Sequence, residues 1–332
     1  MAAADATFGL YLRPGSGPTF GGQLAAYPPK METPSPEYLA EVDAWHAARD
    51  RRLRSPESWV ALTALHWLTP GAHELGQHPS AAIRLEGHDV PPLAGHLLVG
   101  DDLEATIRPH HEARLTHDGE KVAGELPLAD DTDGNPTIVE LGSLRMHLIR
   151  RGAHRDRLAL RIRDTNAPAL AAFEGIPHFP IDAAWRVTAR LERGAEGATV
   201  AVPDIVGDVL QEPSPGSVVL TLEGQQHRLR ALDEDENRLW LIFADATNGT
   251  ETYAAGRFLV TEPVEDDGSV VVDFNLTYNM PCVFSPFATC PLPPEGNRLP
   301  IRVTAGEMLP TWTDGWQPTS APAPASVEPA AD

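Results

Sequence analysis

Residues 271–307 hold the side chains best suited to chemistry in this chain. Both cysteines of the protein lie here, together with a carboxylate and several polar side chains that could bind a ligand, namely Cys282, Cys290, Glu295, Asp273, Asn275, Tyr278 and Asn297. The stretch is too apolar for a linker and too rich in proline for a regular helix or central strand. It indicates an ordered loop held against a core, where binding groups are often found.

The cysteines allow three kinds of chemistry. Their separation of eight residues matches neither the CxxC of redox motifs nor the spacing of zinc ribbons. Cys290 is the candidate nucleophile, with Glu295 and His178 as the other predicted catalytic residues, because prolines on both sides of His178 hold its imidazole in place. A metal bound by Cys282, Cys290 and His178 is one alternative, and a pair of buried structural thiols is the other.

Arginines are the expected anion-binding groups. Seven of them fall within residues 145–163 of a chain that is otherwise strongly acidic. If this run ends in a strand, alternation places Arg161 and Arg163 on one face, opposite Leu160 and Ile162. Their planar guanidinium groups suit carboxylate or phosphate, so they are predicted to bind a ligand. Pairing with aspartates and glutamates of the same protein is the alternative.

A second polar loop, residues 244–258, is predicted to face the same ligand. It contains small and polar residues between Asp245 and Arg257, the two that we expect to contact the bound molecule. Together with His178 and the 273–298 loop they define the predicted pocket.

Four segments carry a resemblance to a known family. DFN, YN, a Pro-Cys pair, FATCPLPP, Asn-Arg-Leu and AGE follow one another in residues 273–307, after AWHAARDRRLRSPESWVALTALHWL, FEGIPHFPIDAAWRV and FADATNGTETYAAGRFL. Together they resemble the bacterial domain-of-unknown-function family 1684, from about residue 38 to residue 307. The resemblance implies no activity, cofactor or catalytic residue, because none is established for that family.

Composition bounds the classes of function. A chain of 332 residues is long enough for two domains. It has no apolar run long enough to span a bilayer. The net charge of −21 argues against nucleic acid and anionic membranes as partners. With only two cysteines and no visible secretory signal, we expect a cytoplasmic protein.

Hydrophobic periodicity predicts a mainly β (α+β) fold. Residues 1–33 read as a poorly ordered extension. Residues 34–165 read as a pair of helices, the first capped by Ser35, followed by a small β-sandwich-like unit. Its opening strand faintly resembles a forkhead-associated domain, although Gln77 stands where that family would have an arginine. Residues 166–310 predict a larger antiparallel β sandwich or barrel that carries the 273–298 loop, and residues 311–332 a Pro/Ala tail.

These features predict a protein that binds a small anionic molecule in a pocket around the 273–298 loop, with hydrolysis or group transfer as the candidate reactions. The alternatives are a non-catalytic binding or interaction module and a metal-binding protein. No cofactor is predicted, and no protein partner can be named from the sequence.

Overall fold

The computed structural model describes residues 34–318, so the predicted extension at residues 1–33 and the end of the predicted tail lie outside the described residues. The fold is mainly β, as predicted. One long helix, α1 (Pro36–Leu53), opens the chain, and several antiparallel sheets follow. Among residues 34–318, no helix is both long and apolar enough to cross a membrane.

Helix α1 begins where the sequence predicts. The Ser35 hydroxyl accepts a hydrogen bond from the Tyr38 N–H at 3.2 Å, and Pro36 occupies the first turn, where its missing N–H is not needed. Val42 and Leu53 are its buried side chains. A single buried stripe shows that the helix packs on the protein through one face.

The prediction of a second helix, after Ser55, is wrong. Residues 55–61 form turns, and Leu62–Leu68 is a strand, β1. This strand pairs along its length with β11, and Ala64 and Leu68 pack against the core of the N-terminal unit. A short apolar run without strict alternation cannot be separated from a helix by periodicity.

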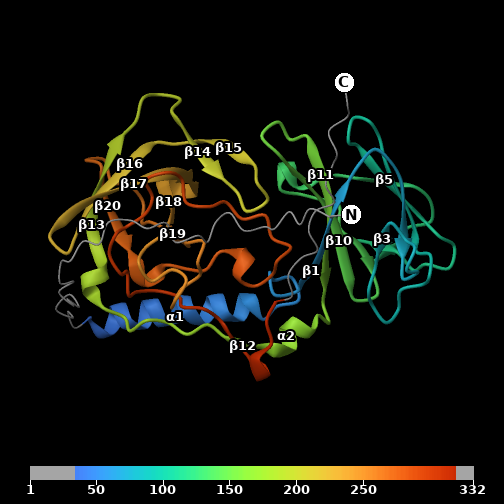
Figure 1. The fold of residues 1–332 in the computed structure, drawn as a ribbon, viewed down its shortest axis with the longest axis horizontal. Coiled ribbons are helices and arrows are strands. Elements are labelled where there is room, and N and C mark those ends of the chain that lie inside the picture. Colours follow the sequence, from blue (N-terminus) through green and yellow to red (C-terminus); the bar gives the residue numbers. More distant parts are fainter. Residues whose placement is uncertain (1–33, 319–332) are drawn as a thin grey trace, which may run out of the picture.

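Two sheets enclose the core of the N-terminal unit (Figure 1). The six-stranded sheet has the order β1-β11-β10-β9-β6-β7, and the five-stranded sheet has the order β3-β2-β4-β5-β8. Buried leucines, valines and isoleucines from both sheets form one cluster between them. The strands after β1 are β2 (Gly71–Gly76), β3 (Ile83–Arg84), β4 (Gly95–Val99), β5 (Ala105–Pro109), β6 (Thr116–His117), β7 (Glu120–Lys121), β8 (Leu126–Leu128), β9 (Val139–Leu141), β10 (Leu144–Arg151) and β11 (Arg157–Asp164).

The C-terminal unit is built on one six-stranded sheet, with the order β19-β18-β17-β16-β13-β20, that curls into a half-barrel. Its two edge strands follow each other in the chain, and the Glu262 N–H bonds the Val271 carbonyl at 3.1 Å where they turn, so the edges meet at one end. The strands are β13 (Arg186–Arg193), β16 (Gly216–Leu222), β17 (Gln225–Glu234), β18 (Arg238–Phe243), β19 (Arg257–Val260) and β20 (Ser269–Asp273).

Smaller elements complete this unit. They are α2 (Pro168–Ala172), the pair β14 (Thr199–Pro203) and β15 (Val209–Pro213), and the pair β12 (Phe173–Gly175) and β21 (Thr311–Trp312). Residues 299–306, which alternate like a strand in the sequence, form none. Leu299, Val303 and Ala305 instead fill the core of the half-barrel.

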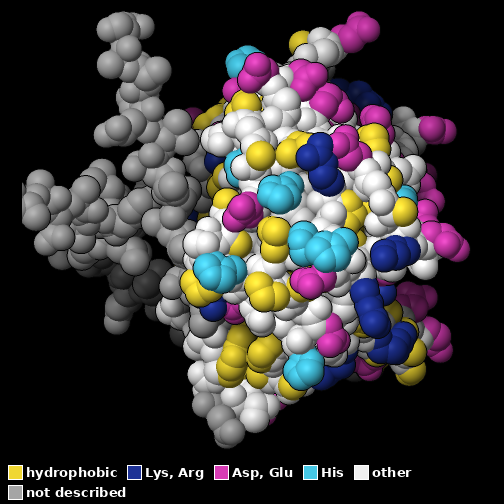
Figure 2. Space-filling model, turned by 90° about the vertical axis from the view of Figure 1, so that its right-hand side faces the viewer, with side chains coloured by type: hydrophobic (Ala, Val, Ile, Leu, Met, Phe, Trp, Pro, Cys, Tyr) yellow, Lys and Arg dark blue, Asp and Glu magenta, His cyan; other side chains and the backbone are white. Residues whose placement is uncertain are grey.

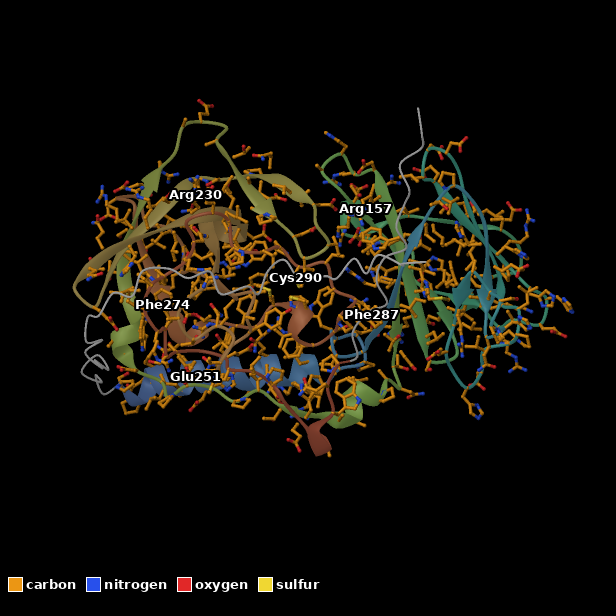
Figure 3. All side chains as sticks on the ribbon, in the orientation of Figure 1. Arg157, Arg230, Glu251, Phe274, Phe287 and Cys290 are labelled. Atoms are coloured by element: carbon orange, nitrogen blue, oxygen red, sulfur yellow. The ribbon has the colours of Figure 1, made fainter. Side chains whose placement is uncertain are left out.

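Helix α1 precedes the N-terminal unit in the chain but packs on the C-terminal unit (Figure 1). The Tyr38 hydroxyl donates to Asp273, with 2.7 Å to Oδ2, and Arg49 donates to the Asn279 carbonyl at 2.8 Å. The predicted division grouped this helix with residues 34–165, whereas these contacts join it to residues 273–308. Figure 3 labels Cys290 and Phe287 between the two units, where the 281–291 segment lies.

Candidate functional site

The side of the β10–β11 strand pair that faces away from the N-terminal core carries basic residues. In the antiparallel register, Arg161 lies opposite His147, and Arg163 lies opposite Arg145. The intervening Leu160 and Ile162 point into the core, as alternation predicts. The sheet therefore brings several cations together on one surface, and this surface faces the C-terminal unit.

Most arginines of this strand pair have a carboxylate partner. Arg151 is 2.8 Å from Asp131, and Arg157 is 2.8 Å from Asp208. Two more pairs complete this set, Arg150 with Asp130 and Arg145 with Glu57 and Glu140. The abundant acidic residues of the chain thus neutralise these four guanidinium groups, as the alternative interpretation of the sequence expects.

Arg161 and Arg163 differ from the others. Among residues 34–318, no carboxylate forms an ion pair with either, and the Nε of each is buried without a hydrogen-bond partner. Arg161 is only 4% exposed, and its one side-chain hydrogen bond within the described part of the chain goes to the Thr289 hydroxyl at 3.3 Å. Both guanidinium carbons lie over the ring of Trp59, at 5.2 and 5.5 Å from its centroid.

The electrostatics follow from this crowding of cations. Burial, with the charges of Arg151 and Arg163 added, lowers the pKa of Arg161 to about 9. Burial also lowers the pKa of Arg163. The pKa of His147 falls to about 4, first because of burial and then because of Arg163 and Arg161. The site therefore carries an excess of positive charge from its arginines. The His147 imidazole is neutral at neutral pH and adds nothing to this charge.

Two cavities lie between the units beside these arginines. Arg163 lines the larger one, whereas Arg161 lines neither and contacts a lining residue of each, Trp59 and Thr289. The larger, of about 910 Å³, is lined by Arg163 and Trp59 from the N-terminal side and by Tyr278, Asp273 and Glu234 from the C-terminal unit. The buried Ser58 hydroxyl also lines it and has no hydrogen-bond partner among the described residues.

The smaller cavity, of about 450 Å³, is lined by Arg151, Thr289, Trp240 and, again, Glu234. Thr289 is the residue that Arg161 contacts. We refer to the two cavities together as the inter-unit groove.

The structure brings some of the predicted site residues to this groove. Tyr278 and Asp273 line it beside Arg163. Asn275 and Asn297 are each 1% exposed and make internal hydrogen bonds. Asn275 donates to the Asp182 carbonyl at 2.9 Å, and Asn297 donates to the carbonyls of Arg230 and Ile242, both at 2.9 Å. A ligand role for these two asparagines stays a prediction.

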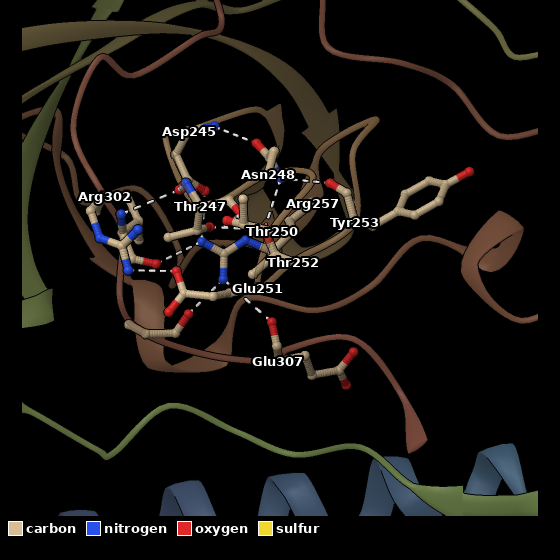
Figure 4. A network of polar contacts seen from close by, with 12 residues as sticks. Asp245, Thr247, Asn248, Thr250, Glu251, Thr252, Tyr253, Arg257, Arg302 and Glu307 are labelled. Atoms are coloured by element: carbon tan, nitrogen blue, oxygen red, sulfur yellow. Dashed lines mark hydrogen bonds and ion pairs between the residues drawn. The ribbon is translucent and has the colours of Figure 1, made fainter. Parts of the chain in front are cut away.

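Arg257 and Asp245 form a fully buried ion pair of 2.7 Å (Figure 4). Arg257 also donates to the carbonyls of Ala305 and Val303, at 2.7 and 2.8 Å, so it ties the 244–258 loop to residues 303–305. Neither side chain has exposed surface. Their ligand role stays a prediction.

The cysteines lie together, away from any contact with His178. The Cys282 N–H donates to the Cys290 sulfur at 3.1 Å. Burial and the Cys282 thiol raise the pKa of Cys290, whereas the hydrogen bond from Cys290 lowers the pKa of Cys282. His178 instead stacks on His46 with ring centroids 3.7 Å apart. Glu295 is exposed.

The predicted catalytic set is therefore not assembled by any contact within residues 34–318, and its role stays a prediction. Within the same residues, no group of three or more histidine, cysteine or acidic side chains is placed to hold a metal ion.

Sequence reasoning missed Trp59 and Thr289, which line the groove, and His147, which lies opposite Arg161 on β10. The alternation that identified Arg161 and Arg163 also exists on β10, where Arg145, His147 and Arg151 occupy one face. Applied there, it would have found His147. No comparable signal exists for Trp59 and Thr289, because loops bring them to the arginines.

Comparison with known proteins identifies one family. Residues 171–308 match the family described as "Protein of unknown function (DUF1684)". The solution structure of an uncharacterized protein from Haloarcula marismortui has 30% identity and a TM-score of 0.36, with 41% of this chain and 77% of that chain covered. No curated protein matches.

Two other solved structures have a TM-score of 0.21. The FHA domain of CT664 from Chlamydia trachomatis is 18% identical and covers 30% of this chain and 93% of its own. Mycobacterium tuberculosis EmbR in complex with a low affinity phosphopeptide is 13% identical and covers 39% and 30%, respectively. Similarity this low says nothing about the ligands of this chain.

Proposed function

We infer that this chain, which belongs to the DUF1684 family, binds a small anion in the inter-unit groove and holds its negative charge with Arg161 and Arg163. One observation carries the proposal. Arg161 is buried and Arg163 is half-buried with its Nε out of contact with water, and no carboxylate of the described residues pairs with either.

The free energy needed to bury an unpaired charge supports this inference. Arginine is almost never fully buried unless it is paired, because taking an uncompensated charge out of water costs several kcal/mol. The four other arginines of β10 and β11 that form ion pairs show that this acidic protein can supply partners at the same surface. A site that leaves two cations unpaired beside a groove is suited to an anion from solution, which restores the missing charge.

The surroundings are suited to a bound organic anion. Trp59 lies under both guanidinium groups, which orients them and removes water from one side. Thr289 and Tyr278 belong to the predicted 273–298 loop, so the proposed pocket keeps that loop as one wall and adds β11 as the other.

Binding without chemistry is the simplest function for this site. The raised pKa of Cys290 keeps its thiol protonated at neutral pH, which opposes a nucleophilic role near Arg161. A hydrolase or transferase is the second candidate. It is favoured by Cys282, whose pKa is lowered by its neighbour Cys290.

Replacing Arg161 with leucine tests the binding function. We expect Arg161→Leu to raise the stability of the ligand-free protein by about 1–4 kcal/mol, because it removes an unpaired buried charge. The rise in melting temperature that inorganic phosphate or succinate causes in the wild-type protein should disappear in the variant. Thermal unfolding at constant ionic strength, with and without each anion, measures both effects.

Arg157→Leu is the matched control. Arg157 lies on the same strand but is bonded to Asp208 and stacked on Trp67 at 3.9 Å. This variant should lose stability and keep the stabilisation by anions. If anions stabilise neither the wild-type protein nor the control, or stabilise Arg161→Leu as much as the wild type, the proposed function is wrong.

A further inference from the structure

We propose that the ligand of the inter-unit groove is a small dianion, either a phosphate monoester or a dicarboxylate, and that one negative charge compensates each of Arg161 and Arg163. This inference rests on the proposed function and specifies its ligand class.

The charge count of the site is the first argument. Four of the six arginines on β10 and β11 have at least one carboxylate partner, namely Arg145, Arg150, Arg151 and Arg157. Within residues 34–318, the guanidinium groups of Arg161 and Arg163 have no carboxylate partner. A monoanion would compensate one of them and leave the other buried without a counter-charge, at the cost of an unpaired ion.

The spacing of the two arginines is the second argument. They alternate on one strand, so their Cα atoms lie about 7 Å apart. Both guanidinium carbons lie above the same Trp59 ring, at 5.2 and 5.5 Å from its centroid. One carboxylate can bind a single guanidinium group with two parallel hydrogen bonds. A phosphate monoester with three terminal oxygens, or a ligand with two carboxylates, can engage both.

The free hydrogen-bonding capacity of the site is the third argument. Arg163 makes no side-chain hydrogen bond within residues 34–318, and Arg161 makes only the one to Thr289. The Ser58 hydroxyl, in the same cavity as Arg163, is also without a partner there. A guanidinium group carries five N–H donors. The donors therefore greatly outnumber the two acceptor oxygens of a monocarboxylate, which favours a ligand rich in acceptors.

The walls limit the ligand to a small molecule. The larger cavity, of about 910 Å³, falls in the range of small-molecule sites. Trp45, Trp59 and Tyr278 contribute aromatic surface to it. Glu234, Glu236, Glu262 and Asp273 line it from the C-terminal unit and outnumber Arg238 on that side, so they disfavour placing negative charge there. The ligand should therefore direct its charges toward β11 and its uncharged part toward the aromatic side chains.

Two matched pairs of ligands test the inference. Methyl phosphate is a dianion at pH 8 and dimethyl phosphate a monoanion, and succinate and monomethyl succinate differ in the same way. Isothermal titration of the full chain at constant ionic strength should give at least tenfold tighter binding for the dianion of one or both pairs. A preference within the phosphate pair alone identifies a phosphate monoester, and a preference within the succinate pair alone identifies a dicarboxylate.

Variants assign the two charges. Arg161→Gln and Arg163→Gln should each reduce the affinity for the preferred dianion to that for its monoanionic partner, and Arg157→Gln should leave the preference intact. Equal affinity for both members of each pair would overturn the dianion inference and leave the proposed function standing. Absence of binding by all four compounds would overturn both.

Discussion

Arg161 and Arg257 are both buried guanidinium groups, but their surroundings assign them different roles. Arg257 has the Asp245 carboxylate at 2.7 Å and two backbone carbonyls within 2.8 Å, so its charge and most of its donors are satisfied inside the protein. Among residues 34–318, the only hydrogen-bond acceptor of the Arg161 side chain is the Thr289 hydroxyl. The first arrangement stabilises a loop, and the second is suited to an anion from outside.

Asp245→Asn should therefore destabilise the protein strongly. The substitution leaves the Arg257 charge buried and uncompensated, which typically costs about 3–5 kcal/mol. Urea denaturation of the variant measures this loss. Glu251→Gln is the control in the same loop, because Glu251 pairs with Arg302 at a partly exposed position and should contribute about 1 kcal/mol or less. Equal losses for both variants would contradict a structural role for the buried pair.

At the scale of elements, α1 is fixed by polar contacts rather than by a large apolar face. Arg49 pairs with Glu307, whose carboxylate is fully buried and whose pKa is raised by burial. His46 stacks on His178 and bonds the Asn275 carbonyl at 3.1 Å. The helix thus depends on groups from residues 178, 275 and 307 to hold its position.

Arg49→Gln tests this docking. It leaves the Glu307 carboxylate without its cation in the core, so we expect a loss of about 3–5 kcal/mol. The free energy of unfolding from urea titration, followed by circular dichroism, measures the effect. Arg51→Gln, two residues along the same helix but exposed, should change stability by about 0.5 kcal/mol or less. A similar small change for Arg49→Gln would show that α1 is held by other contacts.

Local patterns predicted the elements that depend on local physics. The cap at Ser35 identified α1, and alternation placed Arg161 and Arg163 on one face of β11. The same reasoning failed at β1, whose identity is set by pairing with a strand about 100 residues later. Local patterns also could not predict that Trp59 contacts the arginines. Trp59 lies in a turn about 100 residues before β11, and only the tertiary fold brings the two together.

At the scale of the whole molecule, charges of both signs are mixed on the outer face of the N-terminal unit, together with several histidines (Figure 2). The excess of positive charge identified here lies instead in the interior, between the units. Elsewhere in the protein as well as beside the arginines, burial lowers the pKa values of histidines, namely His46, His66, His147 and His178. They are neutral in the folded protein at neutral pH.

These histidines should therefore lower the stability of the folded protein on acidification. The unfolded chain protonates these histidines near pH 6.5, whereas folded His147 and His178 resist until about pH 4. The contribution of these groups is complete above pH 6.5 and is lost progressively as the pH falls toward 4. The raised pKa values of Asp204, Asp273 and Glu307 act in the opposite direction.

His147→Gln isolates one histidine from these opposing effects. Its unfolding free energy should fall less steeply than that of the wild type between pH 6.5 and 4.5, as measured by urea titration at several pH values. Parallel curves for the two proteins would show that His147 titrates alike in the folded and unfolded states.

The docking of α1 also sets an order of events during synthesis. Arg49 and Glu307 are 258 residues apart, so at about 5–20 residues per second the ribosome adds the partner of the helix roughly 13–50 s after the helix itself. Until then, a helix of 18 residues with few buried side chains has little to stabilise it. The strands of the N-terminal unit are therefore synthesised, and free to pair, well before the helix that precedes them can dock on residues 273–307.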